Sequence, residues 1–302
     1  MWIYLGLIAS LFLGLYNIGK KMSLNGNAVL PVLWISTVAG LVLILPVYFI
    51  SRLSPEYANS LNIYIPVLSI TDHCIIAAKS AIMAVSWYLG FYALKHLPIT
   101  IVSPIRSAGP FFTLIGAILI YGERPMPVQW LGFAFIILSM LLYSKVGKLE
   151  GIDFFRNKWI YAIIGSTFFG SSSGLYDKFL VQGRGYDAQT VQFWFSWYIV
   201  LILGVFLLTV WYPRRHFTDK LQWRWSIPMV GILLVASDFF YLRALEQEGT
   251  LIVLLSALKR SQIFISVFVG GFIFKEKNKR KKMIPLLGVI LGVALILYAE
   301  YF

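Results

Sequence analysis

The chain has 302 residues and a formal net charge of +13 at pH 7, with 59% hydrophobic and only 13% charged residues. Soluble domains carry about 25% charged residues, so this composition excludes a water-soluble globule and predicts an integral membrane protein. The basic excess indicates membrane topology and not nucleic-acid binding, because basic residues collect in cytoplasmic loops. The single cysteine, Cys74, and three scattered histidines offer no cluster for a metal or haem, so we expect no cofactor.

The predicted fold is all-α, because ten apolar segments are each long enough to cross a bilayer, which takes about 20 residues. Four of them have a proline near the start, Pro66, Pro98, Pro228 and Pro285, which suits the first turn of a helix. The predicted spans are 2–20, 28–50, 66–94, 98–121, 126–145, 158–181, 187–211, 226–245, 250–274 and 283–301.

The loops between these spans differ in charge. Counting crossings puts the odd loops on one side, and the even loops with both termini on the other. The even loops hold only Arg52, Arg124 and Arg184, whereas the odd loops are rich in lysine and arginine, most densely at 275–282. The positive-inside rule therefore predicts cytoplasmic odd loops and both termini outside. Without a targeting tract or glycosylation sequon, we expect the plasma (inner) membrane of a bacterium or archaeon.

The two halves of the chain resemble each other. Gly-Leu-Tyr-Asn at 14–17 returns as Gly-Leu-Tyr-Asp at 174–177, and Leu-Gly at 131–132 returns at 287–288. Five spans are an odd number, so the second half would enter the membrane upside down relative to the first. The sequence therefore predicts two inverted five-helix repeats, 1–147 and 148–302, around a central cavity, as in many secondary transporters.

The order of spans and a short motif add a family resemblance. The Gly-Glu-Arg end of the fourth span, at 122–124, and the following Gly132, Leu138 and Ser139 resemble the EamA repeat of the drug/metabolite transporter superfamily. The resemblance covers both halves and implies a ten-helix secondary transporter that works by alternating access. Characterised relatives usually keep both termini in the cytoplasm, so the charge pattern here departs from the family.

Ionisable side chains within spans are costly, so each is a candidate for a functional site. Arg106 and Lys259 are related by the repeat at a shift of 153, and Arg260 adds a third cation at the same level. We expect these three to clamp an anion, since arginine suits phosphate and carboxylate groups. The other candidates are Lys79, Asp177, Lys178 and Asp238.

Each of these candidates has a second interpretation. Asp238 could neutralise Lys259 or Arg260 in a closed ionic network without ligand, or could carry a coupling proton. Lys79 is either a cavity cation or a side chain that reaches to the interface. Trp87 and Tyr241 are expected to line the cavity and stack on a ring, the alternative being packing or lipid contact.

Two segments resemble one branch of the superfamily, the triose-phosphate and nucleotide-sugar transporters. They are Ile-Arg-Ser-Ala-Gly-Pro-Phe-Phe at 105–112 and Leu-Lys-Arg-Ser-Gln at 258–262. The resemblance implies that Arg106, Lys259 and Arg260 hold a substrate phosphate. Pro110 is expected to help bend the fourth span.

The sequence therefore predicts a secondary transporter, not an enzyme, for a small organic anion, with a phosphorylated or nucleotide-linked metabolite favoured. One alternative is an EamA-type exporter of amino acids, aromatic metabolites or drugs, and another is a flippase for a lipid-linked sugar. The expected partners are a small-molecule substrate and the lipid bilayer, with no nucleic acid. A homodimer is left open, with weak support from the Gly288–Gly292 pair.

Overall fold

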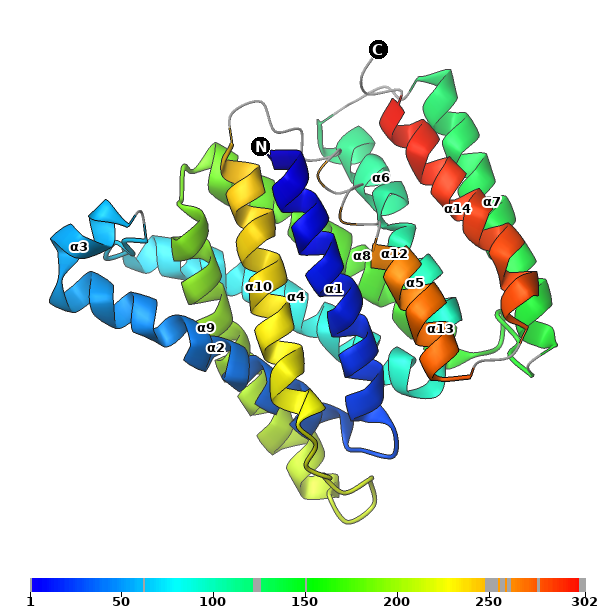
Figure 1. Ribbon diagram of the computed structural model, residues 1–302, viewed down its shortest axis with the longest axis horizontal. Coiled ribbons are helices and arrows are strands. Elements are labelled where there is room, and N and C mark those ends of the chain that lie inside the picture. Colours follow the sequence, from blue (N-terminus) through cyan, green and yellow to red (C-terminus); the bar gives the residue numbers. More distant parts are fainter. Residues whose placement is uncertain are drawn as a thin grey trace.

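The computed structural model describes residues 2–61, 63–121, 126–149, 151–247, 255, 259, 262–275 and 278–298. Within these ranges every regular element is a helix, which confirms the predicted all-α class. Figure 1 shows the helices as one bundle, with the chain running up and down between two ends. α1 begins and α14 ends at one end of the bundle in this view, called here the even end because the even-numbered loops of the sequence belong to it. The opposite end is called the odd end.

The first half of the chain begins with three long helices and one short one. These are α1 (Trp2–Leu24), α2 (Val29–Leu53), α3 (Pro55–Ser60) and α4 (Ile70–His96). The next span is divided into α5 (Ile99–Ser107) and α6 (Gly109–Tyr121), and α7 (Pro127–Lys148) completes the half.

The second half follows with α8 (Lys158–Lys178), which continues into the π-helical turn η1 (Phe179–Gly183). Then come α9 (Ala188–Phe206), the turns η2 (Leu207–Trp211) and η3 (Tyr212–Arg214), and α10 (Ser226–Glu246). The described part of the ninth span comprises α12 (Gln262–Phe264), η4 (Ile265–Val269) and α13 (Gly270–Ile273), and α14 (Lys279–Tyr298) is the final helix.

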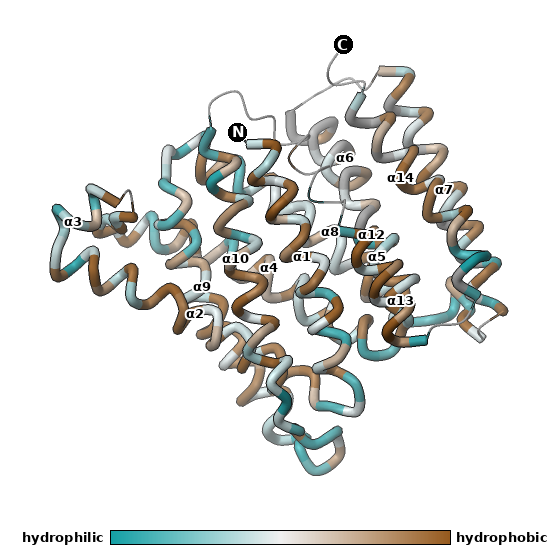
Figure 2. Tube along the Cα trace, in the orientation of Figure 1, coloured by the Kyte–Doolittle hydropathy of each residue, from teal (hydrophilic) through white to brown (hydrophobic). Residues whose placement is uncertain are grey.

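Six helical segments of the described chain are long and apolar enough to cross a membrane. Figure 2 shows the hydrophobic residues along the helices and the hydrophilic ones gathered at the loops. This supports the integral membrane class, while the count of ten spans stays a prediction. The six segments are Trp2–Leu24, Val29–Leu53, Ile70–His96, Trp130–Lys148, Ala188–Arg214 and Ser226–Glu246.

Two predicted helix starts are wrong. The third span begins at Ile70 and not near Pro66, because the Ser69 hydroxyl and the Asp72 carboxylate form a capping box that fixes the helix start. The last span begins at Lys279, so Pro285 lies inside α14 and not in its first turn. Lysine and arginine are good helix formers, so much of the basic run at 275–282 is helical. Pro228, by contrast, lies in the first turn of α10 as predicted.

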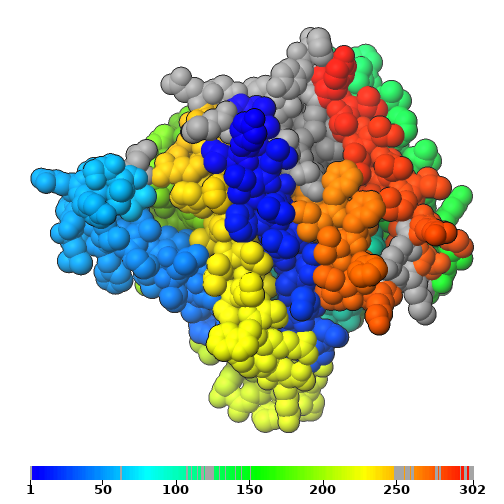
Figure 3. Space-filling model, in the orientation of Figure 1, coloured from blue at the N-terminus to red at the C-terminus, as the bar shows by residue number. Residues whose placement is uncertain are grey.

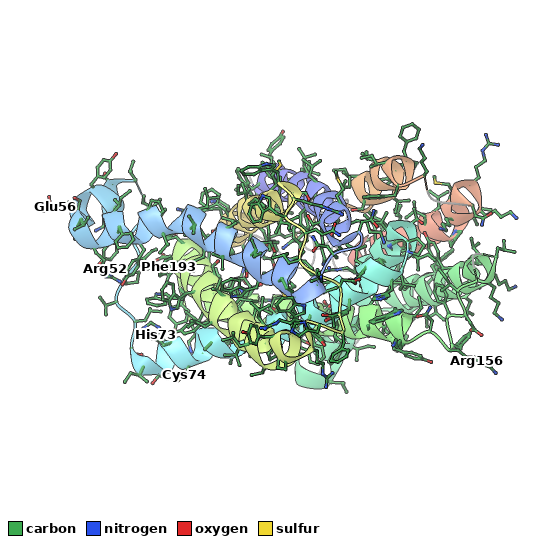
Figure 4. All side chains as sticks on the ribbon, turned by 90° about the horizontal axis from the view of Figure 1, so that it is seen from below. Arg52, Glu56, His73, Cys74, Arg156 and Phe193 are labelled. Carbon is green, nitrogen blue, oxygen red and sulfur yellow. The ribbon has the colours of Figure 1, made fainter. Side chains whose placement is uncertain are left out.

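The main helix contacts join the two halves of the sequence. α1 packs along α10, α4 along α8, and α7 along α14. In Figure 3, α1 lies between α10 on one side and the segment 262–275 on the other. A smaller apolar cluster, Leu41, Ile44, Ile65 and Phe193, joins α2 to α9 at the even end, and Figure 4 shows Phe193 in this corner near His73.

Small residues allow the closest of these approaches. A Cβ atom added to Gly231 of α10 would collide with the backbone carbonyl of Ser36 and lie 2.9 Å from the amide nitrogen of Gly40 in α2. A Cβ on Gly292 of α14 would lie 2.6 Å from the carbonyl oxygen of Gly132 in α7. The Gly288–Gly292 pair therefore packs inside this chain, against α7, as small residues do where membrane helices meet.

Candidate functional site

An internal cavity of about 130 Å³ lies between helices from both halves of the chain. Its walls come from α1, α4, α5 and α6 of the first half, and from α8, α10, Lys259 and Gln262 of the second. The polar side chains in its lining include Asn17, Thr113, Ser171 and Gln262. A mixed polar and apolar cavity among transmembrane helices is the kind of place where transporters bind solutes.

The structure brings most of the predicted site residues together around this cavity. Trp87, Arg106, Asp238, Tyr241 and Lys259 all line it. Arg260 lies outside the described residues. Lys79 stands directly behind the wall, where it pairs with a carboxylate that does line the cavity, as described next.

The first charged pair is Lys79 with Asp177, which links α4 to α8. The two side chains are only 5% and 9% exposed. The Lys79 ammonium also lies 4.3 Å from the centre of the Phe195 ring, a favourable cation–π geometry. Lys79 is therefore an interior cation, and the predicted alternative in which it reaches to the membrane interface is wrong.

The second pair is Lys259 with Asp238 of α10, whose Nζ and Oδ1 atoms are 3.4 Å apart. Both side chains retain about a fifth of their exposure, 22% and 23%, so they face the cavity and are not sealed in protein. The Lys259 ammonium lies 3.9 Å from the centre of the Tyr241 ring. The closed ionic network requires a pair between Asp238 and Lys259, and this pair is present. Both side chains still face the cavity, so a ligand can reach them.

Arg106 reaches the cavity from the point where its span breaks. α5 ends at Ser107 and α6 starts at Gly109, because Pro110 has no backbone N–H to donate to the carbonyl oxygen four residues earlier. The span is thus interrupted beside Pro110, where the sequence predicts a bend, and the bend itself stays a prediction. The Arg106 guanidinium lies against α4, with Nη1 3.5 Å from where a Cβ of Gly90 would stand.

Glycine at position 90 makes the room for this guanidinium. A Cβ atom there would also lie 2.7 Å from the hydroxyl of Ser166. Ser166 and Ser86 exchange hydrogen bonds between their hydroxyls and each other's carbonyls, both at 2.7 Å. These bonds hold α8 close to α4 at the level of Arg106.

Sequence reasoning missed several residues of the site. Tyr16 and Asn17 of α1 line the cavity, and the Asn17 amide donates to Gln262 Oε1 at 2.8 Å and to Ser266 Oγ at 3.2 Å. The signal that could have found them is the internal repeat, which matches Tyr16 and Asn17 with Tyr176 and Asp177. Tyr16 and Asn17 are neutral, so they do not stand out within an apolar span as a charged residue does.

Residues 1–145 match the model of the EamA-like transporter family, which confirms the predicted resemblance over the first half. No curated protein matches the sequence. A solved structure titled only "Crystal structure of protein" shares 12% sequence identity and a TM-score of 0.67, covering 99% of this chain and 98% of that one. At this identity the likeness shows a shared fold alone.

Proposed function

We propose that this chain, EamA-like over its first 145 residues, is a secondary transporter that carries a small organic anion across a membrane by alternating access. The observation that carries the proposal is the cavity itself. It draws its walls from both halves and contains Arg106 together with the partly exposed pair Lys259–Asp238. A cation in a low-dielectric interior attracts an anionic group far more strongly than it would in water.

The pattern of helix contacts supports two inverted repeats, 1–147 and 148–302. Matching the five spans of each half in order pairs α1 with α8, α2 with α9 and α4 with α10. The contact between α1 and α10 then corresponds to the contact between α8 and α4. The α2–α10 contact likewise corresponds to that of α9 with α4, and all four contacts are present. Such pseudo-symmetry around a central site is how many secondary transporters expose one site alternately to either side.

The size of the cavity narrows the substrate. Pockets for drug-sized ligands measure about 300–1,000 Å³, whereas this cavity measures about 130 Å³. A small phosphorylated or carboxylated metabolite is therefore favoured over a nucleotide-linked one. Arg106 would hold the anionic group through paired hydrogen bonds.

Export of amino acids or aromatic metabolites is the second candidate. The observation in its favour is that Asp177 and Asp238 lie in the same cavity as Arg106, with Tyr16, Trp87 and Tyr241 beside them. A zwitterion would find both signs of charge here, and an aromatic ring would find surfaces on which to stack. The lipid-linked sugar flippase stays a prediction without an observation of its own.

The two candidates separate in a binding experiment on purified protein. A ligand that binds the folded state raises the melting temperature by mass action, so we would screen small phosphates, carboxylates and amino acids. For the anion transporter we expect a shift with phosphates or carboxylates that disappears in Arg106→Ala and Lys259→Ala. It should persist in Lys178→Ala, which removes an exposed lysine. Shifts with amino acids alone would favour the exporter, and shifts with none of the panel would contradict both.

A further inference from the structure

Lys20 of α1 is a buried lysine outside the cavity lining described above. Its side chain is fully shielded, with 0% exposure. The ammonium lies 3.7 Å from the centre of the Phe91 ring and 5.5 Å from that of Tyr16. Within the described part of the chain its Nζ atom has no hydrogen-bond partner. The rings of Phe91 and Tyr16 are thus the described groups that face the Lys20 ammonium.

This environment is a costly one for a cation. Buried charges are normally paired with an opposite charge or fully hydrogen-bonded, and a ring face compensates only part of the lost hydration. A methionine has a similar length and would fill the same space without a charge. A lysine here is therefore hard to explain by packing, whereas an ammonium that meets an anion in another state of the protein explains it.

The position of Lys20 relative to the cavity gives that anion a source. Tyr16 lines the cavity, and Lys20 lies one helical turn further along α1, about 6 Å closer to the odd end. The Arg106 guanidinium lies against Gly90 of α4, and the Lys20 ammonium lies on Phe91, the next residue. The two cations therefore follow one another from the cavity toward the odd end.

Beyond Lys20 the odd end is closed by a set of hydrogen bonds, called here the odd-end seal. Lys21 donates to the carbonyl oxygens of Leu94 and Leu97 at 2.6 and 2.7 Å, joining α1 to the end of α4. Lys95 donates to the carbonyl oxygen of Asn27 at 2.8 Å and pairs with Asp219. A path that follows α1 from the cavity to this end would pass Lys20 and would then require these bonds to break.

We propose that Lys20 is the second anion-binding group of the transport path. When the odd-end seal opens, its ammonium leaves the Phe91 ring and receives the anionic group of the substrate from Arg106. This inference rests on the proposed function and adds to it the route by which the substrate leaves the cavity. Arg106 thus binds the substrate in the cavity, whereas Lys20 binds it on its way from the cavity to the odd end.

The test compares binding and passage in the same variants, with inorganic phosphate as the probe. Exchange of radiolabelled phosphate is measured in proteoliposomes, and equilibrium binding is measured by thermal shift. In Lys20→Met we expect phosphate exchange to fall at least tenfold, while the apparent dissociation constant stays within threefold of the unmodified protein. The melting temperature should rise, because the variant removes an uncompensated buried charge. Lys20→Arg keeps the charge and should retain more exchange than Lys20→Met.

Lys282→Met is the matched control. Lys282 is also buried, at 1% exposure, but its ammonium donates to the hydroxyl of Thr100 at 2.8 Å. Losing that bond should lower the melting temperature and leave exchange per folded protein unchanged.

These measurements separate an error in the role of Lys20 from an error in the proposed function. If Lys20→Met exchanges phosphate like the unmodified protein, or melts at a lower temperature, Lys20 is a structural residue and the inference is overturned. The anion transporter itself would still stand on its Arg106 dependence. If the unmodified protein neither binds nor exchanges phosphate or the other anions of the panel, the proposed function fails and this inference fails with it.

Discussion

Asp238 shows at the scale of one residue how the site balances its charges. Its carboxylate lies 3.4 Å from the Lys259 ammonium, so it competes with any anion that approaches this lysine. At about 4 Å, opposite charges attract by roughly 1–4 kcal/mol in surroundings between water and a protein surface. In the proposed anion transporter this carboxylate would weaken anion binding at Lys259, and carrying a coupling proton stays its second predicted role.

Asp238→Asn should therefore strengthen phosphate binding by about fivefold or more, because the neutral amide no longer offsets Lys259. The measurement is a phosphate titration of the melting temperature at two pH values, with Asp153→Asn, in the loop before α8, as control. Weaker binding in Asp238→Asn would contradict this expectation and point to a substrate with an amino group at Asp238.

The sequence could predict the ionisable residues of the site because a charge inside an apolar span stands out. It could not predict which of them pair, since the partners are distant along the chain, as in Lys79 with Asp177. Lys20 is the last residue of the predicted first span and stands next to Lys21, so its position in the sequence does not mark it as an interior charge. Only the packing of α4 against α1, which puts Phe91 beside it, shows that it is buried.

At the scale of helices, the crossing of α2 and α10 depends on one glycine. A side chain on Gly231 would collide with the backbone of Ser36, and a backbone carbonyl cannot turn away as a side chain can. We expect Gly231→Ala to lower the free energy of unfolding by about 1–3 kcal/mol, the usual cost of overpacking. Thermal or denaturant unfolding in detergent measures this.

Gly174→Ala is the comparison, because none of the neighbouring side chains or helices in the described part of the chain comes within 4 Å of an added Cβ at that position. It should unfold like the unmodified protein, although the methyl group enters the cavity lining. Equal stability of Gly231→Ala and the unmodified protein would show that α2 and α10 can move apart without cost.

A second helix contact, at the even end, is sensitive to pH. The hydroxyl of Tyr186, in the loop before α9, donates to Asp72 in the first turn of α4. Burial and this hydrogen bond raise the pKa of Tyr186 above its ordinary value. The folded state therefore favours the protonated phenol, so this contact stabilises the protein fully below the ordinary tyrosine pKa of about 10 and less as pH rises through the raised pKa.

Comparing the unmodified protein with Tyr186→Phe isolates this effect. Between pH 8 and 11 the melting temperature should fall more steeply in the unmodified protein, because phenylalanine has no proton to lose. Parallel curves would mean that the Tyr186 hydrogen bond does not contribute to stability.

Helix existence followed from the sequence, but helix ends did not. Apolar length was enough to find α1, α2, α4, α9 and α10. The start of α4 depends on the Ser69–Asp72 capping box, a local motif within an apolar stretch. The extra helix α3 (Pro55–Ser60) is too short and too polar for a search based on membrane spans.

At the scale of the whole molecule, the two ends of the bundle define its orientation. The positive-inside rule predicts that the odd end is cytoplasmic, and α1 begins and α14 ends at the other end (Figure 1). Glu56 at the even end and Lys220 in the loop before α10 are both exposed. Figure 4 shows Glu56 at the outer edge of the bundle.

Single cysteines at these two positions, in a Cys74→Ala background, test the orientation. In intact cells a membrane-impermeant maleimide should label Glu56→Cys, whereas Lys220→Cys should require permeabilised membranes. The reverse pattern would put both termini in the cytoplasm and would contradict the orientation predicted from the charges of the loops.

The buried charge of Lys20 also bears on the kinetics of an empty transporter. Without an anion, the molecule would have to change conformation while moving uncompensated positive charge through its apolar interior, which is slow. The unloaded return should then limit the cycle, so the protein would act as an obligatory antiporter. Release of labelled phosphate from vesicles should accelerate several-fold when unlabelled phosphate is added outside, and this trans-stimulation should be weaker in Lys20→Met.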